Sequence, residues 1–288
     1  MSDKPNNSTG TFFAIPGWTV VSLQGADARR FAQAQFMGDV DALADGQWQW
    51  NGWLTPKGRV IALFALLRHD ADSLRLLLAD SDPAAFVTAL SRFVFRSKLR
   101  IRHEAELHVG GRFAAPDVAG GASFAGTIEP LALQLDLGGA GGARTVAVGT
   151  APAPEDAAAA ARWRAFDLAH GLPRLDPDQA EQWTPQQLSL DRLRAYSVKK
   201  GCYPGQEIVA RTHFLGQTRR GLVRLGAAAD IPAGDVFPAE APDRASGRIA
   251  SRAGPEALAV LPLDAGDGPC LVGGVECRAL PLLDGLAR

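Results

Sequence analysis

The sequence predicts an α+β protein that ends in a small antiparallel β-barrel. Two observations lead to this prediction. Up to about residue 215, apolar strand-like runs alternate with segments that carry helical periodicity and capping residues. Beyond residue 216, short apolar runs are separated by glycine and proline, which is the spacing of a barrel built from short antiparallel strands.

The first elements are a strand, a helix and a group of three strands. Residues 18–23 are apolar and β-branched, as expected of a buried strand. A helix is expected to follow, because Asp27 is a good N-cap residue, and Phe31 and Phe36 would then face inward. The next strands are predicted at residues 48–53, 59–68 and 73–79, with residues 69–72 as the last turn.

A second helix is predicted after these strands. Asp82 can cap it, and Pro83 suits its first turn. Phe86, Leu90 and Phe93 follow at positions i, i+4 and i+7, so we expect them to form one buried stripe.

The middle of the chain gives weaker signals. Residues 110–154 are rich in Gly, Ala and Pro, and only residues 131–137 and 145–148 resemble strands. Residues 155–170 then form an alanine-rich helix, which Gly171 is expected to close as its C′ residue.

One more helix is predicted before the barrel. Thr184, Pro185, Gln186 and Gln187 match a capping box with proline at the first helical position, which predicts a helix through Leu188 and Leu193. The apolar runs assigned to the barrel are residues 222–225, 248–251, 257–261 and 270–277.

Composition describes an ordinary soluble globular protein. The chain has 288 residues, a hydrophobic fraction of 47%, and 30 basic against 31 acidic residues, so no global charge draws it to nucleic acid or membrane. Residues 1–7 are polar and read as a short disordered lead rather than a signal peptide. The longest apolar run, residues 60–67, is far below the roughly 20 residues of a membrane helix. We therefore expect a cytoplasmic protein with no membrane contact.

The three cysteines do not form a recognisable framework. Their number is odd and no C-x-x-C pair is present, so neither disulfides nor a zinc site is expected. Iron–sulfur clusters usually need four closely spaced thiolates, so no metal ligands are predicted. Cys270 and Cys277 lie in apolar, strand-like surroundings and are predicted to be structural.

The residues around Cys202 carry the strongest chemical signal. Lys199 and Lys200 precede it, and Pro204 is expected to begin a helix through Arg211. Neighbouring cations and a helix N-terminus both favour a thiolate over a thiol. This setting predicts a reactive cysteine that is ionised near neutral pH.

The surroundings of Cys202 leave alternatives open. Gly201 and Gly205 give space for a ligand or partner to approach. However, most free cysteines are small buried hydrophobes, and a lysine pair is usually a solvated face. His213 could serve as a base in a Cys/His pair, but the sequence identifies no acid to orient it, so an exposed loop histidine is the other reading.

Arginine and tryptophan residues suggest possible ligand contacts. Arg211, Arg219 and Arg220 could receive the glutamate tail of a folate or an RNA phosphate. Trp18 and Trp163 could each stack on a flat heterocycle such as a pterin, with core packing as the alternative for both.

These residues give the chain a specific resemblance. It resembles the YgfZ family, a branch of the aminomethyltransferase-like proteins, whose signature K-G-C-Y-x-G-Q-E is matched by residues 200–207. Further matches in the expected order are residues 208–211, residues 23–27 with Gln35 and Asp39, residues 54–59 and residues 171–173.

The resemblance implies aminomethyltransferase-like, folate-binding α+β modules followed by the barrel. It places the folate-binding region at residues 11–215, as two interleaved modules, and the barrel at residues 216–288. The modules comprise residues 11–46 plus 155–215, and residues 47–154. A tetrahydrofolate or a related reduced folate is implied in a central channel.

The resemblance also implies site residues and partners. Cys202 corresponds to the reactive cysteine, and Trp18 and Trp163 correspond to folate-contacting tryptophans. The other folate-binding residues carried over are Lys200, Gly201, Tyr203, Gly205, Gln206 and Glu207 from the signature and Arg211 from the match that follows it. The implied role is that of an accessory factor and not of a conventional turnover enzyme. Its expected partners are iron–sulfur enzymes such as a radical tRNA methylthiotransferase. We expect a monomer with at most a weak tRNA contact.

Two other functions are considered. A tetrahydrofolate-dependent aminomethyltransferase or demethylase would share the fold and the folate. Against it, the R-x-S-Y-T-G-E-like segment of those enzymes has no equivalent here, and they lack the cysteine found at Cys202. An RNA-associated binding module is the third reading, although only Tyr203 and Phe214 offer aromatic rings near the signature.

Overall fold

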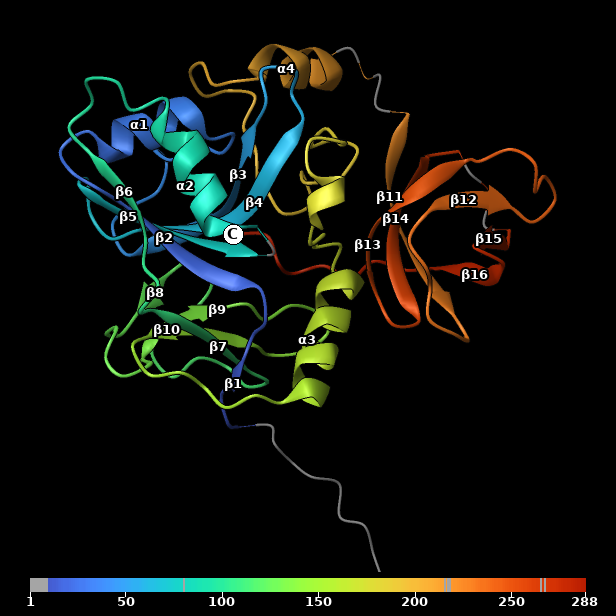
Figure 1. Cartoon of the computed structure of the whole chain (residues 1–288), viewed down its shortest axis with the longest axis horizontal. Helices are drawn as coiled ribbons and strands as arrows, with labels where there is room; N and C mark the ends of the chain where they lie inside the picture. The colour runs from blue at the N-terminus through green and yellow to red at the C-terminus, as the bar shows by residue number, and fades with distance from the viewer. Residues whose placement is uncertain (1–9, 80, 215, 217–218, 265, 267) are drawn as a thin grey trace, which may run out of the picture.

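The molecule consists of a two-sheet body with a closed barrel beside it (Figure 1). The computed structural model describes residues 10–79, 81–214, 216, 219–264, 266 and 268–288, so the predicted lead at residues 1–7 lies outside the described residues. The predicted α+β class and the closed antiparallel barrel are both confirmed. No helix in the described ranges is long and apolar enough to cross a membrane.

The first sheet of the body has the strand order β3-β4-β5-β2-β6 and is antiparallel throughout. Its strands are β2 (Trp18–Gln24), β3 (Gln47–Leu54), β4 (Val60–Arg68), β5 (Ser73–Ala79) and β6 (Arg100–His103). Two helices cover one face, α1 (Ala28–Gln35) and α2 (Pro83–Ser91) (Figure 1). The strands predicted at residues 18–23, 48–53, 59–68 and 73–79 are therefore present.

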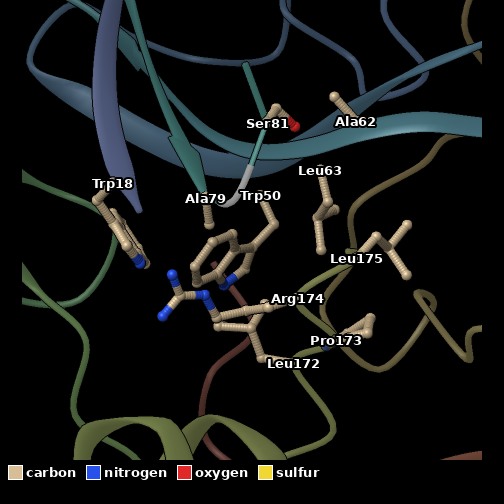
Figure 2. Close-up of a pocket in the computed structure, with 10 residues that line it drawn as sticks. All are labelled: Trp18, Trp50, Ala62, Leu63, Ala79, Ser81, Leu172, Pro173, Arg174 and Leu175. Carbon is tan, nitrogen blue, oxygen red and sulfur yellow. The ribbon is translucent and has the colours of Figure 1, made fainter. Parts of the chain in front are cut away.

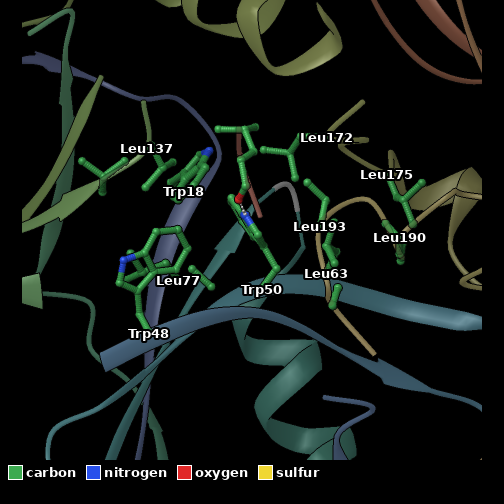
Figure 3. Packing of buried hydrophobic residues seen from close by; sticks show 14 of the residues in the cluster. Trp18, Trp48, Trp50, Leu63, Leu77, Leu137, Leu172, Leu175, Leu190 and Leu193 are labelled. Atoms are coloured by element: carbon green, nitrogen blue, oxygen red, sulfur yellow. Dashed lines mark hydrogen bonds between the residues drawn. The ribbon is translucent and has the colours of Figure 1, made fainter. Parts of the chain in front are cut away.

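Alternation along these strands builds two separate cores. Successive side chains of a strand point to opposite faces. Thus Val21 packs with Phe31 and Phe86 under the helices, whereas its neighbour Val20 packs with Trp50 on the opposite face. Figure 3 shows this second core, which the sheet shares with the rest of the body.

The second sheet has the order β1-β7-β10-β9-β8 and lies against that opposite face (Figure 1). Its strands are β1 (Phe13–Ala14), β7 (His108–Arg112), β8 (Phe124–Ala125), β9 (Leu133–Asp136) and β10 (Thr145–Gly149). The strands expected at residues 131–137 and 145–148 correspond to β9 and β10. In the first sheet, β2 comes from one predicted module and its partners β5 and β6 from the other, so pairing crosses the predicted division at residue 46.

The barrel closes in the order β11-β14-β13-β12-β15-β16. Its strands are β11 (Arg220–Ala227), β12 (Asp235–Pro238), β13 (Gly247–Ala253), β14 (Glu256–Pro262), β15 (Cys270–Val272) and β16 (Val275–Leu280). Residues 270–277 form a hairpin, because Gly273 and Gly274 adopt φ of 53° and 85° between Val272 and Val275, which pair with each other. Positive φ at both central residues is what a two-residue hairpin turn of type I′ requires.

Three further elements and one returning segment link the body to the barrel. The elements are α3 (Ala157–Ala169), the short 3₁₀ helix η1 (Pro177–Gln179) and α4 (Gln206–Phe214). Helix α3 stands between the body and the barrel and contacts β1, β13 and β14 (Figure 1). After β16 the chain returns to the centre of the body, where Leu286 is buried and its carbonyl oxygen accepts a hydrogen bond from Trp50 Nε1 at 2.8 Å.

The helix predicted after Thr184 is wrong. The capping-box hydrogen bonds do form, since Gln187 N donates to Thr184 Oγ1 at 3.2 Å and Thr184 N donates to Gln187 Oε1 at 3.0 Å. The chain then continues in turns, with φ of 47° at Ser189 and 56° at Arg194. Left-handed residues end a helix, so the leucines of this segment reach the core from irregular backbone. These leucines are Leu188, Leu190 and Leu193.

Two finer expectations near the first helices are also corrected. Helix α2 ends at Ser91, so Phe93 lies beyond it with 41% of its surface exposed, and the predicted stripe reduces to Phe86 and Leu90. Asp27 precedes α1 but does not cap it with its side chain. Its carboxylate instead accepts a hydrogen bond from Lys98 N at 2.7 Å, which ties the loop after α2 to the start of α1.

Candidate functional site

The signature turn, which we define as residues 200–205, presents Cys202 at the surface just before α4. Helix α4 begins at Gln206, two residues later than Pro204 suggested. Cys202 is exposed and free, and a Cβ placed on neighbouring Gly201 would meet nothing within 4 Å. The sulfur therefore has open space on the side of the turn that faces away from the protein.

Lys200 anchors the turn from below. Its ammonium group is buried and donates hydrogen bonds to the carbonyl oxygens of Gln33, Phe36 and Gly38, at 2.6 Å for Phe36 and 3.0 Å for Gly38. Burial lowers the pKa of Lys200 to about 8, while the charges of Asp39 and Asp41 act in the opposite direction. All three N–H donors of the ammonium are thus directed into the protein. This differs from the expected cation held beside the sulfur.

Tyr203 and Gln206 complete the underside of the turn. Tyr203 is buried, and its hydroxyl donates to Ser197 O at 3.0 Å. Burial raises the pKa of Tyr203 far above its usual value, so its phenol stays protonated. Gln206 Nε2 donates to Lys200 O at 3.1 Å. The side chains of Lys200 and Tyr203 therefore tie the turn to neighbouring segments, and Gln206 bonds to it from the start of α4.

A close contact between two glycines joins the signature turn to the turn between β3 and β4. Gly205 has φ of 79°, and a Cβ on it would lie 2.7 Å from both Gly58 Cα and Thr55 O. Gly58 has φ of 68°, and a Cβ there would lie 2.9 Å from Ile208 Cβ. Only glycine combines these dihedral angles with this approach. Two motifs far apart in the sequence, residues 54–59 and the signature, are therefore one structural unit.

The charged residues of α4 lie on its outer surface. Glu207 and Arg211 are exposed, as are His213 and Arg219 nearby. His213 contacts Phe214 edge-on, with ring centroids 5.2 Å apart. None of them lines the central cavity described below.

The two remaining cysteines are enclosed in the barrel. Cys270 and Cys277 are paired across β15 and β16 and are both buried and free. Burial raises the pKa of Cys270 to about 11, with Cys277 adding to the effect, and burial also raises the pKa of Cys277. Both thiols therefore stay protonated, as expected of structural residues.

The two predicted folate-contacting tryptophans have different surroundings. Trp163 has none of its surface exposed, and the guanidinium of Arg144 lies 4.1 Å from its ring centroid. Phe13 and Phe113 contact the same indole, with centroids at 5.8 and 5.7 Å. Trp163 is thus enclosed by core partners. Trp18 instead lines a cavity at the centre of the body.

This central cavity lies between the first sheet and the segment after α3 (Figure 2). Trp18 and Trp50 supply aromatic rings, and Arg174 extends beside them, donating to Pro16 O at 2.7 Å. The full lining is Trp18, Trp50, Ala62, Leu63, Ala79, Ser81, Leu172, Pro173, Arg174 and Leu175. Sequence reasoning missed Trp50 and Arg174, although Arg174 directly follows the Gly-Leu-Pro match.

The cavity has the chemistry of a heterocycle site but is closed. Trp18 is 6% exposed, and its Nε1 is a buried donor with no hydrogen-bond partner among the described residues; this is also true of Trp163 Nε1, so what distinguishes Trp18 is that it lines the cavity. Two indoles and a guanidinium suit a flat, polar heterocycle. The free volume is about 10 Å³, however, which is room for about one water molecule. A pterin would fit only after side chains such as Arg174 move.

The cavity and Cys202 are separate features. The turn between β3 and β4 contacts the signature turn at Gly58 and Gly205, and neither glycine lines the cavity. Cys202 is not among the residues that line the cavity. Within the described ranges, no three His, Cys, Asp or Glu side chains are grouped to hold a metal ion.

Comparison with known structures identifies the fold. The chain matches the crystal structure of glycine cleavage system aminomethyltransferase T from Bartonella henselae with a TM-score of 0.67, covering 96% of this chain and 87% of that one, at 13% identity. The protein therefore has the aminomethyltransferase fold, as predicted. At this identity the match concerns the fold alone.

Comparison with curated proteins narrows the class. The chain is 28% identical over 246 residues to the tRNA-modifying protein YgfZ of Sodalis glossinidius. The match covers 78% of this chain and 74% of that protein. It is also 28% identical over 214 residues to an uncharacterized protein of Haemophilus influenzae, with 73% and 71% covered. No family model matches. The resemblance to the YgfZ family is confirmed by these relatives and by the fold.

Proposed function

We propose that this protein is a folate-binding accessory factor that supports the assembly or repair of iron–sulfur enzymes and thereby tRNA modification. The tRNA-modifying role is carried over from the name of the Sodalis glossinidius relative. The observation that carries the proposal is the exposed Cys202 on an anchored turn. A turn whose lysine is bonded to the end of α1 and whose tyrosine is bonded to Ser197 can hold one thiol in a fixed position toward a partner.

Cys202 is proposed as the residue that contacts the partner. Its sulfur would contact either an iron atom of the partner's cluster or a thiol of the partner enzyme. Either contact requires an accessible sulfur. Gly201 leaves that approach open, because no atom lies within 4 Å of its added Cβ position. Lys200 and Gly205 act as positioning residues for the turn and do not need to touch the partner.

The central cavity is proposed as the folate site. Trp18 would stack on the pterin and use its unpartnered Nε1 as a donor, and Arg174 would move aside to pair with a carboxylate or carbonyl of the ligand. A bound reduced folate supplies one-carbon chemistry. Trp163, which is enclosed by Arg144 and phenylalanines, is assigned to the core and not to the ligand.

Tryptophan emission tests the folate site directly. Tetrahydrofolate should quench the emission of the full chain, and Trp18→Phe should weaken this binding because it removes the donor and part of the ring. Trp163→Phe is the matched control and should bind with parental affinity. Equal loss in both variants, or no quenching by the parent, contradicts the proposed site.

The role of Cys202 is tested in cells that lack the chain. Complementation with the parent should restore the activity of iron–sulfur enzymes and the level of methylthio-modified tRNA under oxidative stress, whereas Cys202→Ala should not. Cys270→Ala is a poorer control because the residue is buried, so Arg278→Gln, at an exposed site on the barrel, is the control variant. If Cys202→Ala restores enzyme activity and tRNA modification fully, the proposed role of Cys202 is wrong. Production of methylene-tetrahydrofolate from an aminomethyl donor would favour a transferase instead.

A further inference from the structure

A cationic loop with an exposed phenylalanine lies on the body between α2 and β6. Residues 92–102 contain five cationic residues and no acidic residue. The loop is fixed against the start of α1, because Lys98 N donates to Asp27 Oδ2 at 2.7 Å and Asp27 N donates to Lys98 O at 3.3 Å. We define the loop surface as Arg30, Arg92, Phe95, Arg96 and Lys98, all of which are exposed.

Phe95 is the unusual member of the loop surface. Its side chain is 87% exposed, and its backbone has φ of 45°. A left-handed conformation is unfavourable for a bulky residue other than glycine, and a fully exposed phenyl ring gains nothing from the hydrophobic core. Neither local preference nor packing therefore explains this residue. A ring held outward in this way is available for stacking.

Guanidinium groups surround the ring. Arg30 and Arg96 line the same surface hollow as Phe95, together with Asp27 and Ser97. Among the described residues, neither arginine has a carboxylate within ion-pair distance, whereas nearby Arg29 is paired with Asp41 at 3.4 Å. The one acid of the hollow, Asp27, already accepts the Lys98 bond.

The positive charge continues beyond the loop. Arg100 and Arg102 are exposed on β6, which is the last strand of its sheet and has a free edge. Buried Ile101 between them packs under the helices, so the two arginines share the opposite side of the strand. Cations therefore extend from α1, through the loop, along the edge of the body.

From this juxtaposition we propose that the loop surface binds single-stranded RNA, with Phe95 stacking on a base and Arg30, Arg96 and Lys98 holding phosphates. Interleaved aromatic rings and cations are the usual composition of single-strand sites. Arginine also pairs with phosphate through two N–H groups and stacks on bases. A membrane surface fits less well, because it would need an amphipathic helix or several apolar side chains, and here a single phenyl ring protrudes fully.

This proposal goes beyond the folate and cysteine functions, and it places RNA contact away from the arginines near Cys202. The first measurement is fluorescence anisotropy of the full chain with labelled single-stranded oligouridine and oligoadenosine of about 12 nucleotides, and with a duplex of the same length. We expect the single strands to bind more tightly than the duplex. The logarithm of affinity should fall with the logarithm of salt by about 0.7 for each phosphate contact.

Substitutions separate stacking from charge. Phe95→Ala should weaken single-strand binding roughly tenfold with the salt slope unchanged, and Phe95→Trp should retain binding. Arg96→Gln and Arg30→Gln should each reduce the salt slope by about 0.7. Arg278→Gln, an exposed arginine on the barrel, is the matched control and should behave as the parent. All four sites are exposed, so the variants should keep the parental melting temperature.

Three results would overturn the proposal. The first is that the parent does not bind single strands at about 50 mM salt. The second is that Phe95→Ala and the parent bind RNA with equal affinity. The third is that polyglutamate of the same charge displaces the RNA and that Phe95→Ala does not change this displacement. The last result would identify a surface for an acidic protein instead. Tetrahydrofolate quenching measured on the same variants should be unchanged, so a failed RNA site and a failed folate site give different patterns.

Discussion

The ammonium nitrogen of Lys200 lies 2.6 Å from the carbonyl oxygen of Phe36, although the two residues are 164 positions apart in the chain. With the bonds to Gln33 and Gly38, this contact fastens the turn that presents Cys202 to the end of α1. The lysine of the signature therefore has a structural task that its neighbour Lys199, which is exposed, does not share.

Replacing Lys200 should destabilise the protein. Lys200→Met leaves three carbonyl oxygens without their donor, and an unsatisfied buried polar group costs about 1–3 kcal/mol. We expect a loss of about 3 kcal/mol in the free energy of unfolding, measured with urea, and faster proteolysis of the signature turn. Lys199→Met is the matched control and should change the free energy by less than about 0.5 kcal/mol. Equal effects of the two substitutions would contradict the anchoring role.

A pair of glycine substitutions tests the contact between the two turns. Gly205→Ala must place a Cβ 2.7 Å from Gly58 Cα at a φ of 79°, so it should cost about 2–4 kcal/mol and displace the signature turn. Gly201→Ala meets nothing within 4 Å and should be close to neutral. Thermal unfolding measures the stability of both variants. If Gly205→Ala is as stable as the parent, the two turns are not rigidly joined.

Thiol modification should distinguish the three cysteines. In the native protein Cys202 should react with a disulfide reagent such as Ellman's reagent, because it is exposed, while Cys270 and Cys277 react only after unfolding. Cys202→Ala should abolish the fast reaction. Two or three rapidly reacting thiols in the parent would mean that the barrel opens readily.

The buried ion pair of Arg144 and Asp167 should contribute strongly when only one partner is removed. Both side chains are completely buried and lie 2.7 Å apart, with the guanidinium also 3.8 Å from the Phe166 ring centroid. Arg144→Met leaves a buried carboxylate unpaired and should cost about 3–5 kcal/mol. The double variant Arg144→Met with Asp167→Leu should recover part of that loss in urea unfolding. Additive losses would show that the two charges are not coupled.

Stability should depend on pH through His69. Burial lowers the pKa of His69 from 6.5 to about 4, with Arg75 acting in the same direction and Asp70 opposing it. Between these values the unfolded chain binds a proton that the folded chain does not, so stability falls as the pH drops from 6.5 to 4. His69→Gln should lose this part of the pH dependence, whereas His213→Gln, at an exposed site, should retain it. Parallel pH profiles for the parent and His69→Gln would contradict the assignment.

The regular part of the fold was predictable because its signals are local. Apolar runs marked β2 to β5, and glycine spacing marked the barrel. The turns after Thr184 were not predictable, since a capping box describes only how a helix starts. Their course depends on Ser189 and Arg194 adopting left-handed angles while the leucines pack into a core made by distant strands.

The candidate site shows the same division. The signature identified Cys202, which lies exposed at the surface, and its reactivity stays a prediction. The destination of Lys200 could not be inferred, because its acceptors lie at the end of α1 and just beyond it, far away in the sequence. A tryptophan such as Trp163 is a residue type that can stack on a ligand, but Arg144 and Phe113 contact its indole ring in the structure. The sequence around Trp163 does not predict these contacts. Phe93 likewise reads as part of a hydrophobic stripe with Phe86 and Leu90 until the end of α2 at Ser91 is known.

The segment that leaves β16 gives the barrel a second attachment. The barrel is joined to the body before β11 and again where Leu286 is buried against Trp50, and Arg288 donates to the carbonyl oxygen of Asp136 at 2.9 Å. A module held at only one end could melt or swing by itself. Before the barrel can separate, Leu286 must leave the core of the body, so heating should give one cooperative transition. The orientation of the barrel relative to the body should also be kept when the side chains that line the cavity rearrange.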